Sequence, residues 1–369
     1  MKIINIELKK VFDSKGQETV QSTIITDKIQ ATASSPSGVS AGKHEKQHLI
    51  ENAEKTIEIS KPVIQKIIGH DVDQQKEIDI ILKEVPGAVS ISTSIAVAMA
   101  AAKENNVELY QQLNPNSKKQ MPTLLNLIFA GGSHAKGKGP EFQEFLAIQE
   151  NTTLEEQIEK NKNIHKQAAE KFSLTEQDYE KGWISPFSNE QTIEKLKSFG
   201  CGIGIDAAAS EFFKEGVYKY KTSEKTNQEQ VDYVCDLINK YNIKYFEDPL
   251  DEEDFEGFAQ VLSKTKDCLV VGDDLTTSNK DRLQKAIDMK AINAIIIKPN
   301  QIGTLSEMKE TIDLAKKNNI ICITSHRAGE TNDVYLSHIT VAYDIPYMKI
   351  SIQGDERICK LKELQKLKK

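Results

Sequence analysis

Five short apolar runs in the second half of the chain each end on a charged or titratable residue. The closing residues are Asp206, Glu247, Asp273, Lys298 and His326, and they lie 41, 26, 25 and 28 residues apart. A spacing of about 25 residues fits one β-strand followed by one returning helix. Side chains at the C-terminal ends of successive parallel strands meet at one end of an α/β barrel, so the series predicts a metal site of acids facing a base.

The three acids have the chemistry of ligands for a hard metal ion. Oxygen atoms from Asp206, Glu247 and Asp273 suit Mg²⁺, which prefers octahedral oxygen coordination and keeps water for a substrate. A simpler alternative is that each acid caps the helix that follows its strand. Three acids in one series with a lysine and a histidine favour the metal site.

Lys298 closes the most apolar of these runs, residues 294–297. An amine that projects from an apolar wall and lies beside a dication should lose affinity for its proton, because desolvation and like charge both disfavour the ammonium form. We therefore expect a lowered pKa and a general base at Lys298. The alternative is a lysine whose stem runs along the surface from a helix start.

The segment 325–331, Ser-His-Arg-Ala-Gly-Glu-Thr, pairs His326 with Arg327. Arginine binds phosphate or carboxylate groups through two parallel hydrogen bonds. Lys349 ends a further predicted strand and adds positive charge. Together these side chains predict a pocket for a small, doubly anionic substrate.

The composition excludes several other classes of function. The chain has 369 residues, enough for two domains, and its net charge of −7 predicts no nucleic-acid partner. Its longest apolar stretch, residues 95–102, is too short to cross a bilayer, and residues 1–10 alternate like a strand rather than a signal peptide. Five dispersed cysteines without a CxxC pair indicate reduced thiols and a cytoplasmic protein.

The polar, turn-rich segment 114–120 marks a predicted domain boundary. We predict a smaller N-terminal α+β domain over residues 1–118 and an α/β barrel of (β/α)8 type over residues 119–369. A buried strand over residues 121–128 begins the alternation of strands and helices. The catalytic site is placed in the barrel.

The first domain opens with strands that turn near Asp13 and again at Asp27-Lys28. Residues 34–42 form a loop of small residues, which can bring its backbone close to a ligand. Helical periodicity follows from about residue 46 to 112, with breaks at 69–70 and 86–87.

Several of these motifs, in this order, resemble the enolase (phosphopyruvate hydratase) family over nearly the whole chain. They are Asp13-Ser14-Lys15-Gly16, the loop Pro36 to Gly42, Gly131-Gly132-Ser133-His134-Ala135, Gln143-Glu144-Phe145, Asp206 to Phe212, Glu247-Asp248-Pro249, Gly272 to Leu275, Asn300 to Leu305 and Ser325 to Thr331. The resemblance implies a glycolytic lyase that interconverts 2-phosphoglycerate with phosphoenolpyruvate and water. It implies an enolase-like barrel, Mg²⁺ as cofactor, and a stabilised ene-diolate intermediate.

The same resemblance implies a role for each site residue. Asp206, Glu247 and Asp273 would hold the first Mg²⁺, and Ser40 would close over a second. Lys298 would remove the α-proton, and Lys349 would neutralise the substrate carboxylate. Arg327 would bind the phosphate, and the pocket would also be lined by His134 and His326.

The proton donor to the leaving hydroxide lies in a divergent loop. The family uses a glutamate there, assisted by a second acid that corresponds to Glu144. Alignment on Trp183 puts Glu180 at the donor position, whereas alignment on Pro186 puts Lys181 there. We favour Glu180, and expect the clustering of two acids to raise the pKa of one of them.

Other departures from the family pattern leave two alternatives open. Ala41 replaces a threonine, Ala328 replaces a serine, and Lys349-Ile350-Ser351 replaces Lys-Thr-Gly. The alternatives are a divergent paralogue with weak or altered lyase activity, and a non-catalytic binding or scaffold protein that keeps the fold. The family's dimer contact matches at Glu356-Arg357, so we expect a homodimer.

Overall fold

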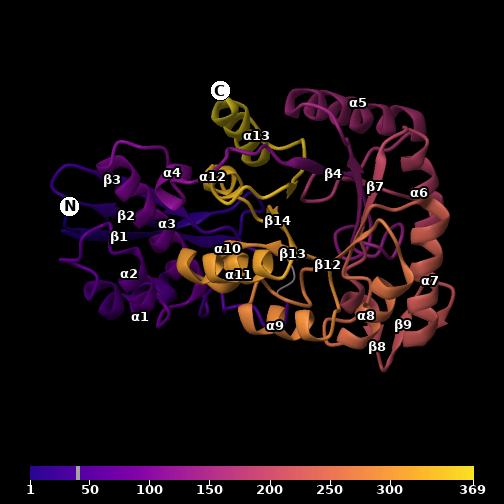
Figure 1. Cartoon of the computed structure of the whole chain (residues 1–369), viewed down its shortest axis with the longest axis horizontal. Helices are drawn as coiled ribbons and strands as arrows, with labels where there is room; N and C mark the ends of the chain where they lie inside the picture. The colour runs from indigo at the N-terminus through magenta and orange to yellow at the C-terminus, as the bar shows by residue number, and fades with distance from the viewer. Residues whose placement is uncertain (39–41) are drawn as a thin grey trace.

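The chain begins with a three-stranded antiparallel sheet, in a computed structural model that describes residues 1–38 and 42–369 (Figure 1). Its strands are β1 (Asn5–Phe12), β2 (Glu18–Ile25) and β3 (Gln30–Ser34). The carboxylate of Asp13 accepts the backbone N–H groups of Lys15 and Gln17, which closes the first turn. The second turn lies at the predicted Asp27-Lys28 pair.

Four helices complete the N-terminal region. They are α1 (Ala53–Gln65), α2 (Gln75–Leu82), α3 (Gly87–Glu104) and α4 (Leu109–Leu113). The predicted breaks are confirmed, because the chain leaves α1 before Gly69 and enters α3 after Pro86. Helix α3 is rich in alanine and serine and is buried on almost every side. Its small side chains let it pack on β2 and β3 and also against α10 (Pro299–Ile302) of the barrel.

Eight strands form a closed barrel in the second part of the chain. In ring order they are β4 (Thr123–Ala130), β5 (Glu144–Ile148), β7 (Gly202–Asp206), β11 (Tyr245–Glu247), β12 (Leu269–Gly272), β13 (Ala294–Ile297), β14 (Ile321–Ser325) and β15 (Tyr347–Lys349). Pairing of β15 with β4 closes the ring, so no strand edge of the barrel is left open. A short strand, β6 (Trp183–Ile184), pairs with β4 outside the ring.

The barrel differs from a strict strand–helix alternation at its beginning. Strand β5 follows β4 without a helix and runs antiparallel to both β4 and β7. The connection, residues 131–143, is rich in glycine and has no apolar helical face, so it folds back as a turn. At Gly131 a side chain would collide with the carbonyl oxygen of Phe142, which explains the need for glycine at this close approach.

Helices surround the barrel. They are α5 (Leu154–Phe172), α6 (Asn189–Lys197), α7 (Asn227–Tyr241), α8 (Phe255–Lys264), α9 (Lys280–Asp288), α10 (Pro299–Ile302), α11 (Leu305–Lys317), α12 (Tyr335–Ala342) and α13 (Asp355–Lys368). A short 3-10 helix (Ala209–Phe212) and the small sheet β8 (Phe213–Lys214), β9 (Val217–Lys219) and β10 (Glu224–Lys225) extend the loop after β7. Figure 1 shows the C-terminal α13 lying beside α12, on the side of the barrel nearest the N-terminal region.

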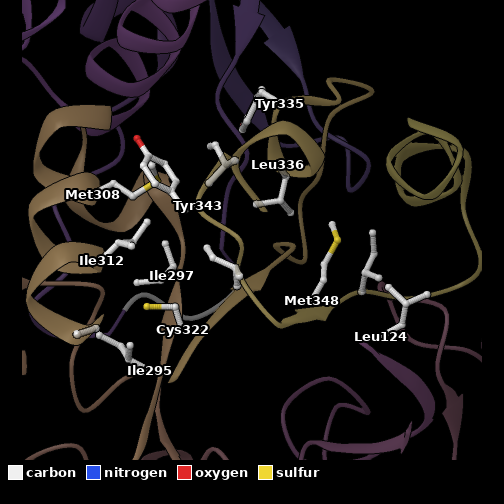
Figure 2. Close-up of a cluster of buried hydrophobic side chains, with 14 of the residues drawn as sticks. Leu124, Ile295, Ile297, Met308, Ile312, Cys322, Tyr335, Leu336, Tyr343 and Met348 are labelled. Carbon is white, nitrogen blue, oxygen red and sulfur yellow. The ribbon is translucent and has the colours of Figure 1, made fainter. Parts of the chain in front are cut away.

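The core has an inner and an outer layer because successive side chains of a strand point to opposite faces. On β13, Ala294 and Ile296 belong to the cluster inside the barrel, whereas Ile295 and Ile297 belong to the larger cluster outside it. Figure 2 shows Ile295 and Ile297 in one buried cluster with Met308 and Ile312 of α11. This alternation decides which way each strand-end residue points.

The predicted domain boundary between residues 118 and 119 stays a prediction. The polar segment that contains it is held on the barrel, because Ser117 donates to the carbonyl oxygen of Val341 at 2.6 Å and the backbone N–H of Lys118 donates to Asp344 at 2.9 Å.

Candidate active site

The strand-end residues of the barrel converge because each continues the inward-facing set of its strand. Lys298 follows the outward Ile297, so it is the next residue to face the barrel axis. The same alternation directs Asp206 of β7, Glu247 of β11 and Lys349 of β15 inward. The residues that precede them, Ile205, Phe246 and Met348, belong to the outer cluster. Asp273 follows the outward Gly272 position in the same way. All five side chains therefore meet at one end of the barrel.

Glu144 reaches the same end from the opposite chain direction. It begins the antiparallel strand β5, so its position lies at the edge where the parallel strands end. The strand register pairs Glu144 directly with Asp206 of β7. An antiparallel strand thus adds a carboxylate to a site otherwise built from strand C-termini.

Lys349 holds three of these carboxylates together. Its Nζ lies 2.9 Å from Oε2 of Glu144, 2.7 Å from Oδ2 of Asp206 and 2.7 Å from Oε2 of Glu247. Burial alone would lower the pKa of Lys349, but the three anions together raise it well above its usual value. The amine is a permanent cation at the bottom of the pocket.

Lys298 is ion-paired with Asp273, which also accepts a hydrogen bond from the amide of Gln301 at 2.9 Å. Burial lowers the pKa of Lys298, but the negative charges around it, led by Asp273, more than offset that effect and the pKa is raised. The sequence predicted a lowered pKa for Lys298, whereas the contacts described here raise it. The prediction considered the apolar wall and a dication but not the direct ion pair with Asp273, which holds the proton on the amine.

The acid-rich side of the pocket has more negative charge than its lysines neutralise. Ligand oxygens of Glu247, Asp248 and Asp273 lie within 4.8 Å of one another, and all three side chains are buried. Among the described residues, Oε1 of Glu247 has no hydrogen-bond partner. Burial, followed by the neighbouring acids, raises the pKa of Glu247, Asp248 and Asp274 well above the usual range. Buried, partly unsatisfied oxygens with surplus charge fit a hard divalent cation.

Asp248 and Asp274 were not predicted as site residues. Asp248 turns inward because its backbone adopts a positive φ of 41°, which breaks the strand alternation. Its carboxylate accepts the backbone N–H groups of Asp273 and Asp274 at 3.1 and 2.8 Å. The Glu-Asp-Pro motif was visible in the sequence, but nothing in its spacing indicated that both acids face the pocket.

The opposite side of the pocket carries Glu180 and His326. Oε2 of Glu180 lies 2.9 Å from Nε2 of His326, and both side chains are buried. The carboxylate of Asp178 accepts the backbone N–H groups of Glu180 and Gly182, which forms a tight turn that aims Glu180 inward. Lys181 takes the positive φ of this turn and does not line the pocket.

His134 belongs to the same group of side chains as Glu144 and Glu180. Its Nδ1 is 3.2 Å from Asp178 and 3.9 Å from Glu144, and ligand atoms of His134, Glu144 and Glu180 all lie within 4.8 Å. Burial opposes the charged ring, but the hydrogen bond to Asp178 and the nearby glutamates raise the pKa of His134 to about 9.

The expectation that clustering raises the pKa of one acid holds for Glu144 rather than Glu180. Burial is the main cause that raises the pKa of Glu144 to about 8. Burial also acts on Glu180, but the positive groups around it outweigh that effect, first His326 when its ring is protonated and then His134 and Arg357, so the pKa of Glu180 lies well below the usual value. Near neutral pH, Glu144 therefore holds the proton of the pair.

Arg327 is held by a residue from the N-terminal region. Its Nη1 and Nη2 donate to both carboxylate oxygens of Glu45 at 3.1 to 3.2 Å, and Nη1 also donates to Asn300 at 3.3 Å. Glu45 also accepts from the amide of Gln301 at 3.2 Å. The carboxylate of Glu45 is thus already paired with the arginine that was expected to bind an anionic group of the substrate. Glu45 lies in an aperiodic polar segment, which provided no signal for this contact.

These groups surround one pocket. Its lining contains nine of the predicted site residues: His134, Glu144, Glu180, Asp206, Asp273, Lys298, His326, Arg327 and Lys349. Glu247 is not part of this lining, but its carboxylate contacts Lys349, which is. Ser40 lies outside the described residues.

Two departures from the family pattern leave room in this pocket. Ala328 lines it with a methyl group in place of a hydroxyl. Ile350 belongs to the outer apolar cluster, so its side chain points away from the site. Neither replacement blocks the pocket.

A third cluster of possible metal ligands, Glu108, His338 and Glu363, lies outside this pocket. Lys366 pairs with both glutamates, at 3.6 and 3.0 Å, so their charge is already compensated. Within residues 1–38 and 42–369, no helix combines the length and the apolar character needed to span a bilayer.

Comparison with known proteins agrees with this architecture. Residues 3–113 match the family described as "Enolase, N-terminal domain", and residues 190–369 match "Enolase, C-terminal TIM barrel domain". The chain is 36% identical to the enolase of Methanosphaera stadtmanae, over 99% of this chain and 96% of the relative. It is 35% identical to the enolase of Archaeoglobus fulgidus, again over 99% and 96% of the two chains. The barrel, the converging strand-end acids and these matches show that the chain belongs to the enolase family, the phosphopyruvate hydratases, which are carbon–oxygen lyases.

Proposed function

We propose that this chain converts 2-phosphoglycerate reversibly to phosphoenolpyruvate and water, with Lys298 as base and Glu180 at the leaving group. The observation that carries the proposal is the presence of two groups of side chains in one pocket. The first contains Lys298 and the acids around Asp273, and the second contains His134, Glu144 and Glu180. A substrate between these groups would have its α-proton on the lysine side and its hydroxyl on the glutamate side.

Asp206, Glu247 and Asp273 are the proposed ligands of a divalent cation, and the hard oxygen set favours Mg²⁺. Two of them, Glu247 and Asp273, belong with Asp248 to a group of buried acids whose ligand oxygens lie within 4.8 Å of one another. When bound, the cation would supply electrostatic stabilisation of the negative charge that develops on the substrate carboxylate. Lys349 adds a fixed positive charge at the same place. The predicted role of Ser40 at a second cation stays a prediction outside the described residues.

Lys298 acts as a base only after it loses its proton. Asp273 stabilises the ammonium form in the structure. If Asp273 served as a metal ligand, Lys298 would lose this anionic partner, and its pKa would fall towards the range of a useful base. Lys298 then takes the α-proton, and the electron pair of that C–H bond moves towards the carboxylate.

The second step breaks the bond between carbon and the hydroxyl group. Glu180 and Glu144 share one proton, which Glu144 holds at neutral pH. We assign Glu180 to the delivery of this proton to the departing hydroxyl, so that water leaves. Arg327 would bind the phosphate, which requires that its contact with Glu45 be shared or replaced. His134 and His326 line the pocket around this acid pair.

A turnover assay with 2-phosphoglycerate and Mg²⁺, run beside α-proton exchange in deuterated water, tests this assignment. Lys298→Ala should lose both exchange and turnover, by roughly 10²-fold to 10⁴-fold. Glu180→Gln should retain exchange but lose turnover to a similar extent. Lys181→Ala, the matched control from the alternative loop alignment, should keep both. A wild-type chain that shows neither reaction would favour the divergent or the non-catalytic alternative.

We further propose a homodimer formed along the N-terminal sheet. Strand β1 is an edge strand, and Phe12 and Ile4 are 62% and 55% exposed. A groove beside Phe12 is also lined by Asp355 and Glu356 of the C-terminal helix. Arg357, the other half of the predicted dimer contact, is buried inside the chain. Sedimentation analysis should show a dimer that Phe12→Asp weakens.

We also propose a cytoplasmic location. All five cysteines are free thiols in the structure, and burial raises the pKa of several of them, which suits a reducing compartment. Microscopy of the tagged chain in its native cell would test this, and a secreted or periplasmic signal would contradict it.

A further inference from the structure

Arg357 is a buried cation that the proposed reaction does not use directly. It stands in the first turn of α13, and its side chain is 0% exposed. Its Nη2 donates to the backbone carbonyl oxygens of Arg327 and Ala328 at 3.3 and 3.1 Å, and Nη1 pairs with Glu356. The guanidinium is thereby held in one orientation against the segment that carries the pocket histidine.

The remaining donor of Arg357 contacts that histidine. Nε of Arg357 lies 2.9 Å from Nδ1 of His326. A guanidinium has only donors and does not lose its proton in proteins, so Nδ1 must offer a lone pair. The ring proton of His326 is therefore on Nε2, the atom that lies 2.9 Å from Oε2 of Glu180.

From this geometry we infer that Arg357 is a positioning residue, which fixes the Nε2–H tautomer of His326 and so keeps a ring N–H, rather than a lone pair, beside the carboxylate of Glu180. The inference rests on the proposed role of Glu180 at the leaving group. With the tautomer fixed, His326 is an uncharged donor that orients Glu180 and stabilises its carboxylate after the proton has left. With the opposite tautomer, Nε2 would present a lone pair to the carboxylate and the two groups would repel each other.

The charges around His326 agree with this assignment. The groups that face the ring are Glu180 from the loop after α5, Glu330 from the loop after β14 and Arg357 from α13. Burial, with a contribution from Arg357, lowers the pKa of His326 despite the two acids. A neutral ring is the form that can accept from Arg357 and at the same time present its Nε2–H beside Glu180.

Nitrogen-15 NMR of the full-length chain, labelled at its seven histidines, reads the tautomer directly. The His326 signals are identified by their loss in His326→Gln. We expect an unprotonated Nδ1 and a protonated Nε2 that do not titrate between about pH 6 and 9, because Arg357 excludes the second proton. A protonated Nδ1, or an imidazolium in this range, overturns the inference. This measurement needs no substitution at Arg357.

Kinetics of Arg357→Ala provide the second readout. We expect kcat for 2-phosphoglycerate to fall about 10-fold to 100-fold, as for other residues that orient a functional histidine, with KM changed less than about threefold. The His326 ring should then titrate. Lys360→Ala is the matched control, because Lys360 is an equally buried cation on α13 that pairs with Glu330 at 2.8 Å and does not touch His326.

The outcomes separate the inference from the proposed function. An equal loss of kcat in both variants, or an unchanged His326 tautomer in Arg357→Ala, overturns the positioning role. Absence of turnover in the wild type would instead refute the proposed function, while the NMR result would still decide the tautomer.

Discussion

The acid-rich half of the pocket is carried by strand ends, whereas the histidine half is carried by loops and by α13. In the first half, Asp206, Glu247 and Asp273 stand on the regular frame of the barrel. In the second half, Glu180 depends on a tight turn, and His326 depends on Arg357 from the last helix. The rigid frame brings like charges together, and the irregular segments pair opposite ones.

This difference also appears in the charge balance. The acid-rich half contains five carboxylates, of which those of Asp206, Glu247, Asp248 and Asp273 are buried and that of Asp274 is half-buried. Lys298 and Lys349 are the amines that contact this group. Several of those acids have strongly raised pKa values because each faces another anion in a buried place. In the histidine half, each acid faces a ring or a cation. The first half is therefore organised to receive a positive ion, and the second is organised to move a proton.

The largest expected effect is the loss of the cation that holds the acid-rich half together. Lys349→Met leaves three buried carboxylates facing one another, and should lower the free energy of unfolding by about 3–5 kcal/mol. Urea unfolding at pH 7 without divalent ions measures this. The same substitution at the exposed Lys266 should change it by less than about 0.5 kcal/mol. A loss below about 1 kcal/mol at Lys349 would show that the carboxylates do not depend on it.

The second expected effect distinguishes the halves by their response to Mg²⁺. An ion that binds only the folded chain should raise the free energy of unfolding by about 2.7 kcal/mol at one hundred times its Kd. Asp273→Asn should remove most of this gain, whereas Glu180→Gln should retain it. Thermal unfolding with and without Mg²⁺ measures the gain. Equal gains in both variants would place the ion elsewhere.

The smallest expected effect is a pH dependence from the histidine half. The hydrogen bond to Asp178 and the nearby glutamates raise the pKa of His134 to about 9 against the opposing effect of burial, so the folded state binds a proton that the unfolded state releases near pH 6.5. The resulting stability is complete below about pH 6.5 and is lost as pH rises through 9. We expect the free energy of unfolding of the ion-free chain to fall by at least about 1 kcal/mol over this range.

His134→Gln should have a shallower slope than the wild type between these pH values. Glu144, whose pKa is also raised, acts in the same direction at lower pH and remains in the variant. Unfolding midpoints measured at several pH values would reveal the difference. An unchanged slope above pH 6.5 would show that His134 does not hold the proton.

The sequence by itself determined the barrel and the acid-rich half. Successive side chains of a strand point to opposite faces, which is a local property. Once a strand is assumed, the sequence alone therefore shows which strand-end residues face the barrel axis. The positions of Asp206, Glu247, Asp273, Lys298 and Lys349 follow from this rule. Their spacing also indicated one strand and one helix for each unit, apart from the antiparallel β5.

Only the tertiary structure decided the rest. The position of Glu180, and not Lys181, in the pocket lining depended on the turn around Asp178. The contacts of Glu45 and Arg357 join segments that are far apart in the chain. The raised pKa of Lys298 depended on the separation from Asp273. Charge interactions fall steeply with distance and grow with burial, and neither quantity is local in sequence. Residue types therefore indicated which chemistry was available, while the fold decided which groups hold a proton.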